Sequence, residues 1–382
     1  MVDTNMNTSS ASPLHESLQI NCSKENTIFI PDNVSSLSDH LFTETDRIMI
    51  TVLLPIVVTV GVLGNAAFLF MVKRLDRMHT LANMCLENIA VADIILLISG
   101  PPVYVWSYFA SPIRNNMPIL HGGCFATFLI SQIGYYASFG LITVISLERW
   151  LAICRPLQHR RMAHKSRMVK SIASAWIIGS AIAVLNTLRY GKGQWMCMKW
   201  PESESFQLTL PKYLHTCVSM GTYFDIYPEI VELLTFAIGF SVNGVFYIKI
   251  IKKLSNRLST ASSTGDSQTI KVRNQVARLS IINGVVFFIC HTPLVISNLH
   301  GILQSIFSVN LLSKSQYESG TIAGHAFRYV NSCVHVFVYA FSSTFYRDGF
   351  REVFDFCGLL RRKSTTPRII KAADTCMIAT RM

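Results

Sequence analysis

The apolar stretch IMITVLLPIVVTVGVLGNAAFLFMV occupies residues 48–72 and contains no charged side chain. About 20 apolar residues in a helix are enough to cross the hydrocarbon core of a bilayer, so this stretch predicts a membrane-spanning helix. Six further runs of similar character follow along the chain, at 81–106, 125–152, 168–188, 227–251, 276–299 and 323–341. The sequence therefore predicts an all-α membrane protein built as a seven-transmembrane helix bundle.

The composition of the 382 residues agrees with this fold class. Half of the residues are hydrophobic and 15% are charged, whereas a soluble globular protein has about 25% charged residues. The mean hydropathy is +0.36. These values exclude intrinsic disorder for most of the chain, because disordered segments have low hydrophobicity and few aromatic residues.

The basic residues indicate how the chain is oriented. Lys and Arg gather after the first, third, fifth and seventh runs, beginning with Lys73, Arg74 and Arg77. The positive-inside rule places these connections and the C-terminus in the cytosol, with the N-terminus outside the cell. We therefore expect a multi-pass protein of the plasma membrane. A nucleic-acid partner is disfavoured despite the net charge of +12, because the charges flank apolar runs.

This topology divides the chain into four segments. They are an extracellular tail at 1–46, the helix bundle at 47–342, a short amphipathic helix on the inner membrane leaflet at 343–356, and a cytoplasmic tail at 357–382. The extracellular tail has N-glycosylation sequons at Asn7, Asn21 and Asn33. Cys357 follows the amphipathic helix and is a candidate for palmitoylation.

Four cysteines fall on the extracellular side, namely Cys22, Cys124, Cys197 and Cys217. Thiols outside the cell are usually oxidised. A bridge from Cys124 to Cys197 or to Cys217 would tie the long loop between the fourth and fifth spans over the bundle. The even number allows a second bridge to Cys22, but connectivity does not follow from the sequence.

Ionisable residues inside membrane spans are costly and mark functional sites. Asp93 lies in the middle of the second span. Polar residues of other spans reach a matching depth, namely Asn65, Ser138, Asn331, Ser332 and His335. We therefore expect a polar core cluster around Asp93.

Two features of the spans suit a conformational switch. Glu148 and Arg149 form a charge pair at the cytosolic end of the third span, where the arginine can bond to its neighbour or to an adjacent helix. The alternative is an arginine that only extends to the interface. Pro293 interrupts the sixth span and predicts a kink, which acts as a hinge or is simply static.

Several short motifs occur in the expected order along the spans. They are Gly64-Asn65, Leu86-Glu87-Asn88-Ile89-Ala90-Val91-Ala92-Asp93, Ser146-Leu147-Glu148-Arg149-Trp150 followed by Arg155-Pro156-Leu157, Trp176, Tyr247, Cys290-His291-Thr292-Pro293, and Asn331-Ser332 followed by Tyr339. From about residue 47 to 356 the chain resembles the rhodopsin-like (class A) G-protein-coupled receptors. The resemblance implies an extracellular ligand, heterotrimeric G proteins as partners, and arrestin and receptor kinases as regulators.

The chain departs from the family pattern at several positions. Gly239 stands where the family keeps a proline in the fifth span, His291 replaces its toggle tryptophan, and His335-Val336 replaces Asn-Pro. These departures resemble neuropeptide receptors of the FMRFamide-related kind. By this resemblance the switch residues are Glu148, Arg149, Tyr247, His291, Pro293 and Tyr339.

The resemblance also implies roles for the cysteines and the polar core. Family members keep the loop cysteine shortly before the fifth span, so Cys124 pairs with Cys217, with Cys197 as the alternative. The polar core around Asp93 binds sodium in related receptors. A protonated His335 would compete with that sodium ion, whereas a neutral His335 would act only as a hydrogen-bond donor.

The ligand class follows from residues that are missing as well as from those present. Amine receptors carry an aspartate at the place of Ser131, and opsins carry a lysine at the place of Tyr329. The predicted ligand pocket consists of Ser131, Gln132, Tyr135, Glu229, Glu232, Asn298, His325, Arg328 and Tyr329. Acidic residues at its mouth suit a peptide that carries arginine or an amidated C-terminus. Alternatively, Glu229 and Glu232 simply face water.

Other functions are weighed against the peptide receptor. A receptor of the same class for a lipid or another small molecule is the main alternative. A transporter or channel is disfavoured because the two halves of the chain show no internal repeat. We expect no enzymatic activity, because the histidines lack ligand spacing and no nucleophile is paired with a base. The expectation is therefore no catalytic residue, no metal centre, and no cofactor besides an allosteric sodium ion.

Overall fold

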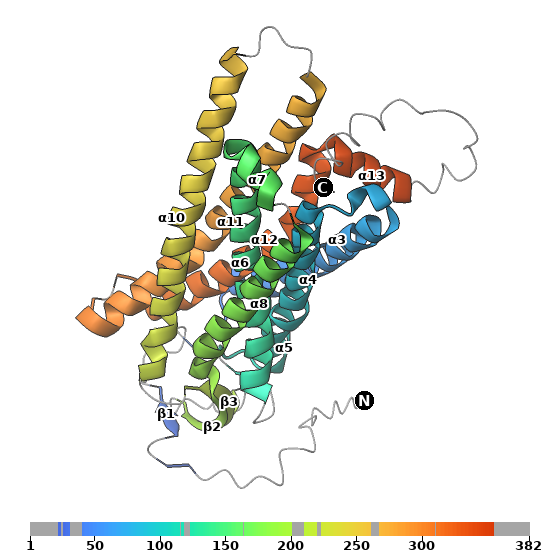
Figure 1. Ribbon diagram of the computed structural model, residues 1–382. Helices are drawn as coiled ribbons and strands as arrows, with labels where there is room; N and C mark the ends of the chain where they lie inside the picture. Colours follow the sequence, from blue (N-terminus) through green and yellow to red (C-terminus); the bar gives the residue numbers. More distant parts are fainter. Residues whose placement is uncertain are drawn as a thin grey trace, which may run out of the picture.

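The structure is a computed structural model, and it describes residues 22–23, 26–30, 40–114, 116–117, 123–162, 164–200, 210–219, 223–260, 267–309 and 311–354. The glycosylation sequons at Asn7, Asn21 and Asn33 and the palmitoylation candidate Cys357 lie outside the described residues. Most of the described part is helical, and a small β-sheet lies at one end of the bundle (Figure 1). We call this the sheet end and the opposite end the α13 end.

Within the described residues, six helical segments are long and apolar enough to cross a membrane. They are Glu44–Arg74, Leu81–Ala110, Gly123–Cys154, Lys165–Tyr190, Ile226–Asn256 and Arg278–Phe307. The seventh predicted span is α12 (Lys314–Ser342), which is less apolar and packs against α11, α3 and α4. The seven predicted spans are therefore all helices of one bundle.

The first span contains a local distortion next to a proline. It consists of α2 (Glu44–Ile48), the π-helical turn η1 (Met49–Leu53) and α3 (Leu54–Arg74). Pro55 has no N–H to donate to the preceding turn, which favours a change of hydrogen-bond register there. At the start of the span, the Thr43 hydroxyl accepts from the Asp46 N–H, and the Asp46 carboxylate accepts from the Thr43 N–H. This capping box fixes where the span begins.

The next spans end where glycine or proline occurs. The turn η2 (Asp76–Met78) leads into α4 (Leu81–Ser99), and α5 (Pro101–Ala110) follows the break at Gly100. The third span is α6 (Gly123–Cys154), and Pro156 begins the short helix α7 (Pro156–Met162). The fourth span is α8 (Lys165–Thr187), extended by the turn η3 (Leu188–Tyr190).

The two longest helices are α10 (Tyr223–Thr260) and α11 (Ser267–Phe307), and both extend past the rest of the bundle at the α13 end (Figure 1). The amphipathic helix predicted at 343–356 is present as α13 (Thr344–Phe354). It docks on the bundle through a hydrogen bond of 2.6 Å from the Tyr346 hydroxyl to Asn83 Oδ1 and an ion pair of 2.5 Å between Arg77 and Glu352.

The sheet has three strands in the order β1–β2–β3. The long loop between the fourth and fifth spans forms β2 (Lys192–Lys199) and β3 (Tyr213–Val218), which pair antiparallel with Gly193 opposite Cys217. The first strand, β1 (Thr27–Phe29), pairs parallel with β2 and places Thr27 opposite Cys197. The N-terminal segment is therefore not only a solvated tail, because residues 27–29 are part of the sheet.

Two disulfides anchor the sheet. Cys124 at the start of α6 bonds to Cys217 of β3, the pairing that the family resemblance implies. Cys22 bonds to Cys197 of β2, the second bridge that the even number of cysteines allows. The hairpin is therefore tied both to the bundle and to the N-terminal segment.

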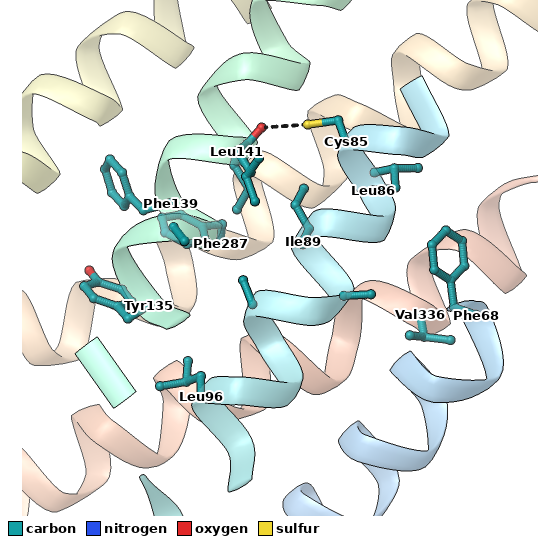
Figure 2. Close-up of a cluster of buried hydrophobic side chains, with 14 of the residues drawn as sticks. Phe68, Cys85, Leu86, Ile89, Leu96, Tyr135, Phe139, Leu141, Phe287 and Val336 are labelled. Carbon is teal, nitrogen blue, oxygen red and sulfur yellow. Dashed lines mark hydrogen bonds between the residues drawn. The ribbon is translucent and has the colours of Figure 1, made fainter. Parts of the chain in front are cut away.

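The core of the bundle surrounds α6, which contacts α4, α8, α10 and α11. Figure 2 shows part of the buried cluster, including Phe139 and Leu141 of α6 and Phe287 of α11. The Cys85 thiol donates to the Leu141 carbonyl across 3.4 Å. Gly239, at the family's proline position, faces Phe139, and a Cβ atom there would lie 2.2 Å from the ring. Burial of these aromatic and aliphatic side chains stabilises the bundle, each by about 1.5–3 kcal/mol.

Candidate functional site

The predicted polar core cluster forms in the middle of the bundle. One oxygen of Asp93 accepts hydrogen bonds from the hydroxyls of Ser138, at 3.1 Å, and Ser332, at 3.0 Å. The Asn65 side chain donates to the backbone carbonyl of Ser332 across 2.9 Å. Asp93 is fully buried, so the hydrogen bonds from the third and seventh spans stabilise its carboxylate, and Asn65 of the first span holds the Ser332 backbone in place.

His335 completes this cluster. Its Nε2 atom lies 3.9 Å from the second oxygen of Asp93, Oδ2, and 3.2 Å from the side-chain nitrogen of Asn331. Oδ2 has no hydrogen-bond partner within the described residues. All six residues predicted for the polar core therefore converge, and one carboxylate oxygen is left to be satisfied by His335 or by an ion.

The carboxylate of Glu148 lies at the α13 end and has two partners. It is bonded to His159 of α7 at 2.7 Å and to Arg167 of α8 at 2.6 Å. The Glu148–Arg149 contact, one of the two arrangements expected for this arginine, is therefore not formed in this structure. Successive residues of a helix point in different directions, so Glu148 faces α7 and α8 and Arg149 faces elsewhere.

Arg149 lines a small cavity between the helices, together with Asn283, His335, Tyr339 and other side chains. Within the described residues Arg149 forms no ion pair, and its buried Nε atom has no hydrogen-bond partner. The guanidinium is thus held near the α13 end without a carboxylate. Tyr339, another predicted switch residue, packs against Phe68 at a centroid distance of 5.2 Å.

The other predicted switch residues lie along α10 and α11. The Tyr247 hydroxyl lies 2.8 Å from the hydroxyl of Ser146 on α6. His291 stacks between Tyr135 and Phe287, and its Nδ1 atom bonds to the Phe287 carbonyl at 2.7 Å. His291 therefore belongs to the aromatic core, and within the described residues it forms no hydrogen bond or ion pair with Asp93. Pro293 lies inside α11, two residues after His291.

Arg328 of α12 is the centre of the predicted ligand pocket. Its guanidinium pairs with Glu232 of α10, donates to Gln132 of α6 at 3.5 Å, and lies 3.9 Å from the centroid of the Tyr135 ring. The second oxygen of Glu232 accepts from Asn298 of α11 across 3.0 Å. We call these five residues the Arg328 cluster. They come from four helices, and the ion pair at their centre is almost fully buried.

A second carboxylate on α10 is also neutralised. Glu229 pairs with Arg189 of η3 at 2.7 Å, and the Tyr317 hydroxyl lies 3.5 Å from the same oxygen. The side chains of Glu229 and Glu232 are 5% and 12% exposed. The alternative that both simply face water is therefore wrong. The expected net acidity is also absent, because each carboxylate has its own arginine.

The three remaining predicted pocket residues form a second group on α6 and α12. Tyr329 is hydrogen bonded to the Ser131 side chain. His325 packs against Tyr329 and against Tyr104 of α5, with centroid distances of 6.5 and 5.7 Å. The nine predicted pocket residues are thus the five of the Arg328 cluster, the group of Ser131, His325 and Tyr329, and Glu229 with its own arginine. All of them lie in the half of the bundle near the sheet end.

The sequence reasoning missed a buried ion cluster at the sheet end. Arg114 pairs with Asp46 at 2.5 Å and with Glu318 at 3.3 Å, and it also donates to Ser319. Its neighbour Ile113 forms a β-bridge with Leu41. A lone arginine in a loop gives no signal of such pairing, because its partners come from the ends of two distant helices.

A cavity of about 360 Å³ lies beside this ion cluster at the sheet end. Its walls come from all three strands, from the connection after α5, and from the start of α12. They include Ile28, Met117, Met196, Leu214, Lys314 and Glu318. We call this cavity the vestibule. Its lining combines apolar side chains with a charged edge, as is usual for ligand sites.

These features define the class of protein. A seven-helix membrane bundle has a polar cluster in its middle, charged clusters at both ends, and a cavity beneath a disulfide-anchored sheet. This arrangement is that of a seven-transmembrane bundle with a site at one end.

Comparison with known proteins identifies the family of the chain. The family described as 7 transmembrane receptor (rhodopsin family) matches residues 64–339. The chain belongs to this family of cell-surface receptors, which act through heterotrimeric G proteins. It is 26% identical to neuromedin-U receptor 1 of Rattus norvegicus, over 78% of this chain and 73% of that one.

Two further relatives cover a similar part of the chain. It is 25% identical to somatostatin receptor type 2 of Mus musculus, over 85% and 81% of the two chains. It is 24% identical to the allatostatin-A receptor of Bombyx mori, over 77% and 76%. The narrower resemblance to FMRFamide-related receptors stays a prediction.

Proposed function

We propose that this receptor binds an extracellular neuropeptide and transmits binding to a heterotrimeric G protein. The observation that carries the proposal is the vestibule under the sheet, with the Arg328 cluster deeper in the bundle. An extended peptide uses both a wide outer cavity and deeper polar contacts. The relatives support the same ligand class, because they are receptors named for neuromedin U, somatostatin and allatostatin A.

The charges of the deeper site refine this proposal. Glu229 and Glu232 are neutralised by Arg189 and Arg328, so a charged ligand group that reaches this depth must break an existing pair. A lipid with a long uniform chain would use none of these polar contacts, and a small amine would find both Glu229 and Glu232 already paired with arginine. A peptide supplies backbone donors and acceptors that bond to polar groups without adding net charge.

A screen of neuropeptides on cells that express the receptor tests the ligand class, with calcium and cAMP measured together. We expect one peptide or a small related set to give a response that untransfected cells lack. An Arg149→Ala receptor at equal surface level serves as the matched control, since it should bind without signalling. A response to lipids or amines, with none to any peptide, would contradict the proposal.

We infer the orientation and the remaining partners from the sequence. Residues 1–46 lie outside the cell and 357–382 lie in the cytosol, where the latter offer serines and threonines to receptor kinases and then to arrestin. Epitope tags at the two termini test this: antibodies should stain the N-terminal tag on intact cells and the C-terminal tag only after permeabilisation. The lipid bilayer is the remaining partner, through α13.

We infer in addition that the residues around Asp93 fit a sodium ion. The buried Oδ2 atom of Asp93 lacks a hydrogen-bond partner within the described residues, and the hydroxyls of Ser138 and Ser332 are hard oxygen ligands beside it. The ion would supply one positive charge next to the carboxylate. His335, 3.9 Å away, supplies the same charge when protonated, which makes the ion and the imidazolium competitors.

A further inference from the structure

The ion pair between Arg328 and Glu232 connects two helices that lie apart in the sequence, α12 and α10. Its side chains are 3% and 12% exposed. Charges that are removed from water this completely are strongly attracted to each other, and separating them without a replacement is costly. The pair therefore fixes the distance between α10 and α12 at this level of the bundle.

The surroundings of the pair fix its geometry. Arg328 lies against the face of Tyr135, an arrangement that stabilises a guanidinium. Gln132 bonds to the same guanidinium and Asn298 bonds to the carboxylate. Through these contacts α6 and α11 are also connected to the pair. The Nε atom of Arg328 is buried without a hydrogen-bond partner in the described part of the chain, so the site still offers one donor.

The neighbouring pair on α10 differs in what it connects. Glu229 lies one turn from Glu232, but its arginine comes from η3 at the end of α8. Only the Glu232 pair brings an arginine of α12 into contact with α10. The start of α12 is held by the Arg114 ion cluster through Glu318 and Ser319, and the Arg328 contact holds the same helix deeper in the bundle.

We propose that the Arg328–Glu232 pair is a latch that holds α12 against α10 in the unliganded receptor, and that an agonist opens it by replacing one partner. This inference rests on the proposed function, because it assumes that the receptor has a resting and a signalling state. A ligand shifts such an equilibrium only through contacts that differ between the states. The latch supplies one such difference at the floor of the ligand site.

The experiment compares variants in the absence of any ligand. Glu232→Gln/Arg328→Gln removes the latch but leaves no unpaired buried charge, so the protein should fold. Glu232→Arg/Arg328→Glu restores a pair with reversed polarity. Arg77→Gln/Glu352→Gln is the matched control, because it removes the same charges from a pair between η2 and α13, outside the ligand site.

Two readouts are measured at matched surface level. The first is basal nucleotide exchange on purified G proteins. The second needs no G protein: a fluorophore on Arg278→Cys reports movement at the α13 end of α11, where Arg278 is exposed. The background carries Cys154→Ser, Cys333→Ser, Cys357→Ser and Cys376→Ser, so that the label does not react elsewhere. We expect the double glutamine variant to raise basal exchange roughly fivefold to tenfold, a coupling typical between two linked sites. The fluorescence should change as well, and the reversed pair should lie within about twofold of the parent.

The outcomes separate the latch from the proposed function. If the fluorescence changes but no G protein responds, the latch stands and the G-protein part of the proposed function fails. Basal exchange and fluorescence equal to the parent in the double glutamine variant would overturn the latch, even if peptides activate the parent. A change of equal size in the Arg77/Glu352 control would also overturn it, because the effect would not be specific to this pair.

Discussion

Arg328 and Arg149 are both held among the helices, one in the half near the sheet end and the other near the α13 end, and the structure treats them differently. Arg328 has a carboxylate, an amide and an aromatic face as partners. Arg149 has no ion pair within the described residues, while its neighbour Glu148 is bonded to both His159 and Arg167. Within the described residues, Arg328 is therefore neutralised by its own carboxylate, whereas Arg149 lies near the α13 end without one.

This difference indicates which of the two arginines is available to a group from a binding partner. A closed ion pair resists solvent and holds helices together, and it opens only when a ligand replaces one member. An arginine without a carboxylate is available to a group that arrives later, such as a backbone carbonyl of a bound protein. Arg149 is therefore suited to the signalling step, and Arg328 to maintaining the resting structure.

The largest expected effect comes from replacing Arg149, which has no carboxylate partner within the described residues. Arg149→Ala should reduce agonist-stimulated nucleotide exchange to the level of untransfected cells. Ligand affinity should be preserved, because the proposed ligand site lies in the other half of the bundle. Thermal stability should change by less than about 0.5 kcal/mol, since no ion pair is lost. Radioligand binding, exchange and thermal unfolding on one preparation check all three. Signalling equal to the parent would refute the assigned role of Arg149.

Removing the paired arginine should act mainly on stability. Arg328→Gln leaves Glu232 buried without its cation, which we expect to cost about 3–5 kcal/mol of unfolding free energy. Glu232→Gln/Arg328→Gln should recover most of that loss, because neither charge is then present. Thermal unfolding of the purified variants decides the point. Equal stability of the single and double variants would contradict the proposed role of the ion pair. So would an Arg149→Gln variant that is destabilised as much as Arg328→Gln.

A smaller effect is expected at Glu148, which has two partners. His159→Ala removes one and leaves Arg167 at 2.6 Å, so we expect a loss of about 1–2 kcal/mol. His159→Ala/Arg167→Ala should cost more than the sum of the two single changes, because the carboxylate then has neither partner. Unfolding measurements on the three variants test this. Additive losses would mean that the two contacts to Glu148 are independent.

Much of this architecture was predictable from the sequence because the membrane imposes simple rules. A long apolar run must be a helix, and six of the seven predicted runs meet that description in the structure while α12 completes the bundle. The polar core around Asp93 was predictable too, since a charge in the middle of a span requires partners at the same depth. The Cys124–Cys217 disulfide agreed with the family resemblance.

The errors concern partners that only the packed structure defines. Arg189 lies at the end of α8, and nothing in its neighbourhood in the sequence indicates that it neutralises Glu229. Glu148 and Arg149 are adjacent in the sequence, but the helix points them in different directions. The strand β1 has only three residues and gains its structure from β2 and from Cys22, so its sequence carries too little signal by itself.

The smallest expected effect concerns His335, which lies between the two arginines in the middle of the bundle. His335→Asn removes the imidazole that competes with sodium for the free oxygen of Asp93, 3.9 Å away. In the parent the imidazole still competes with sodium, so its thermal stability should differ little between sodium chloride and N-methylglucamine chloride. In the variant, sodium should stabilise the receptor by about 1 kcal/mol, because an ion that binds only the folded state adds its binding free energy. Asp93→Asn/His335→Asn is the control and should abolish the sodium effect. If His335→Asn changes neither the sodium dependence nor the pH dependence of signalling, His335 is a neutral hydrogen-bond donor. It then acts neither as a paired charge, like Arg328, nor as a charge without a carboxylate, like Arg149.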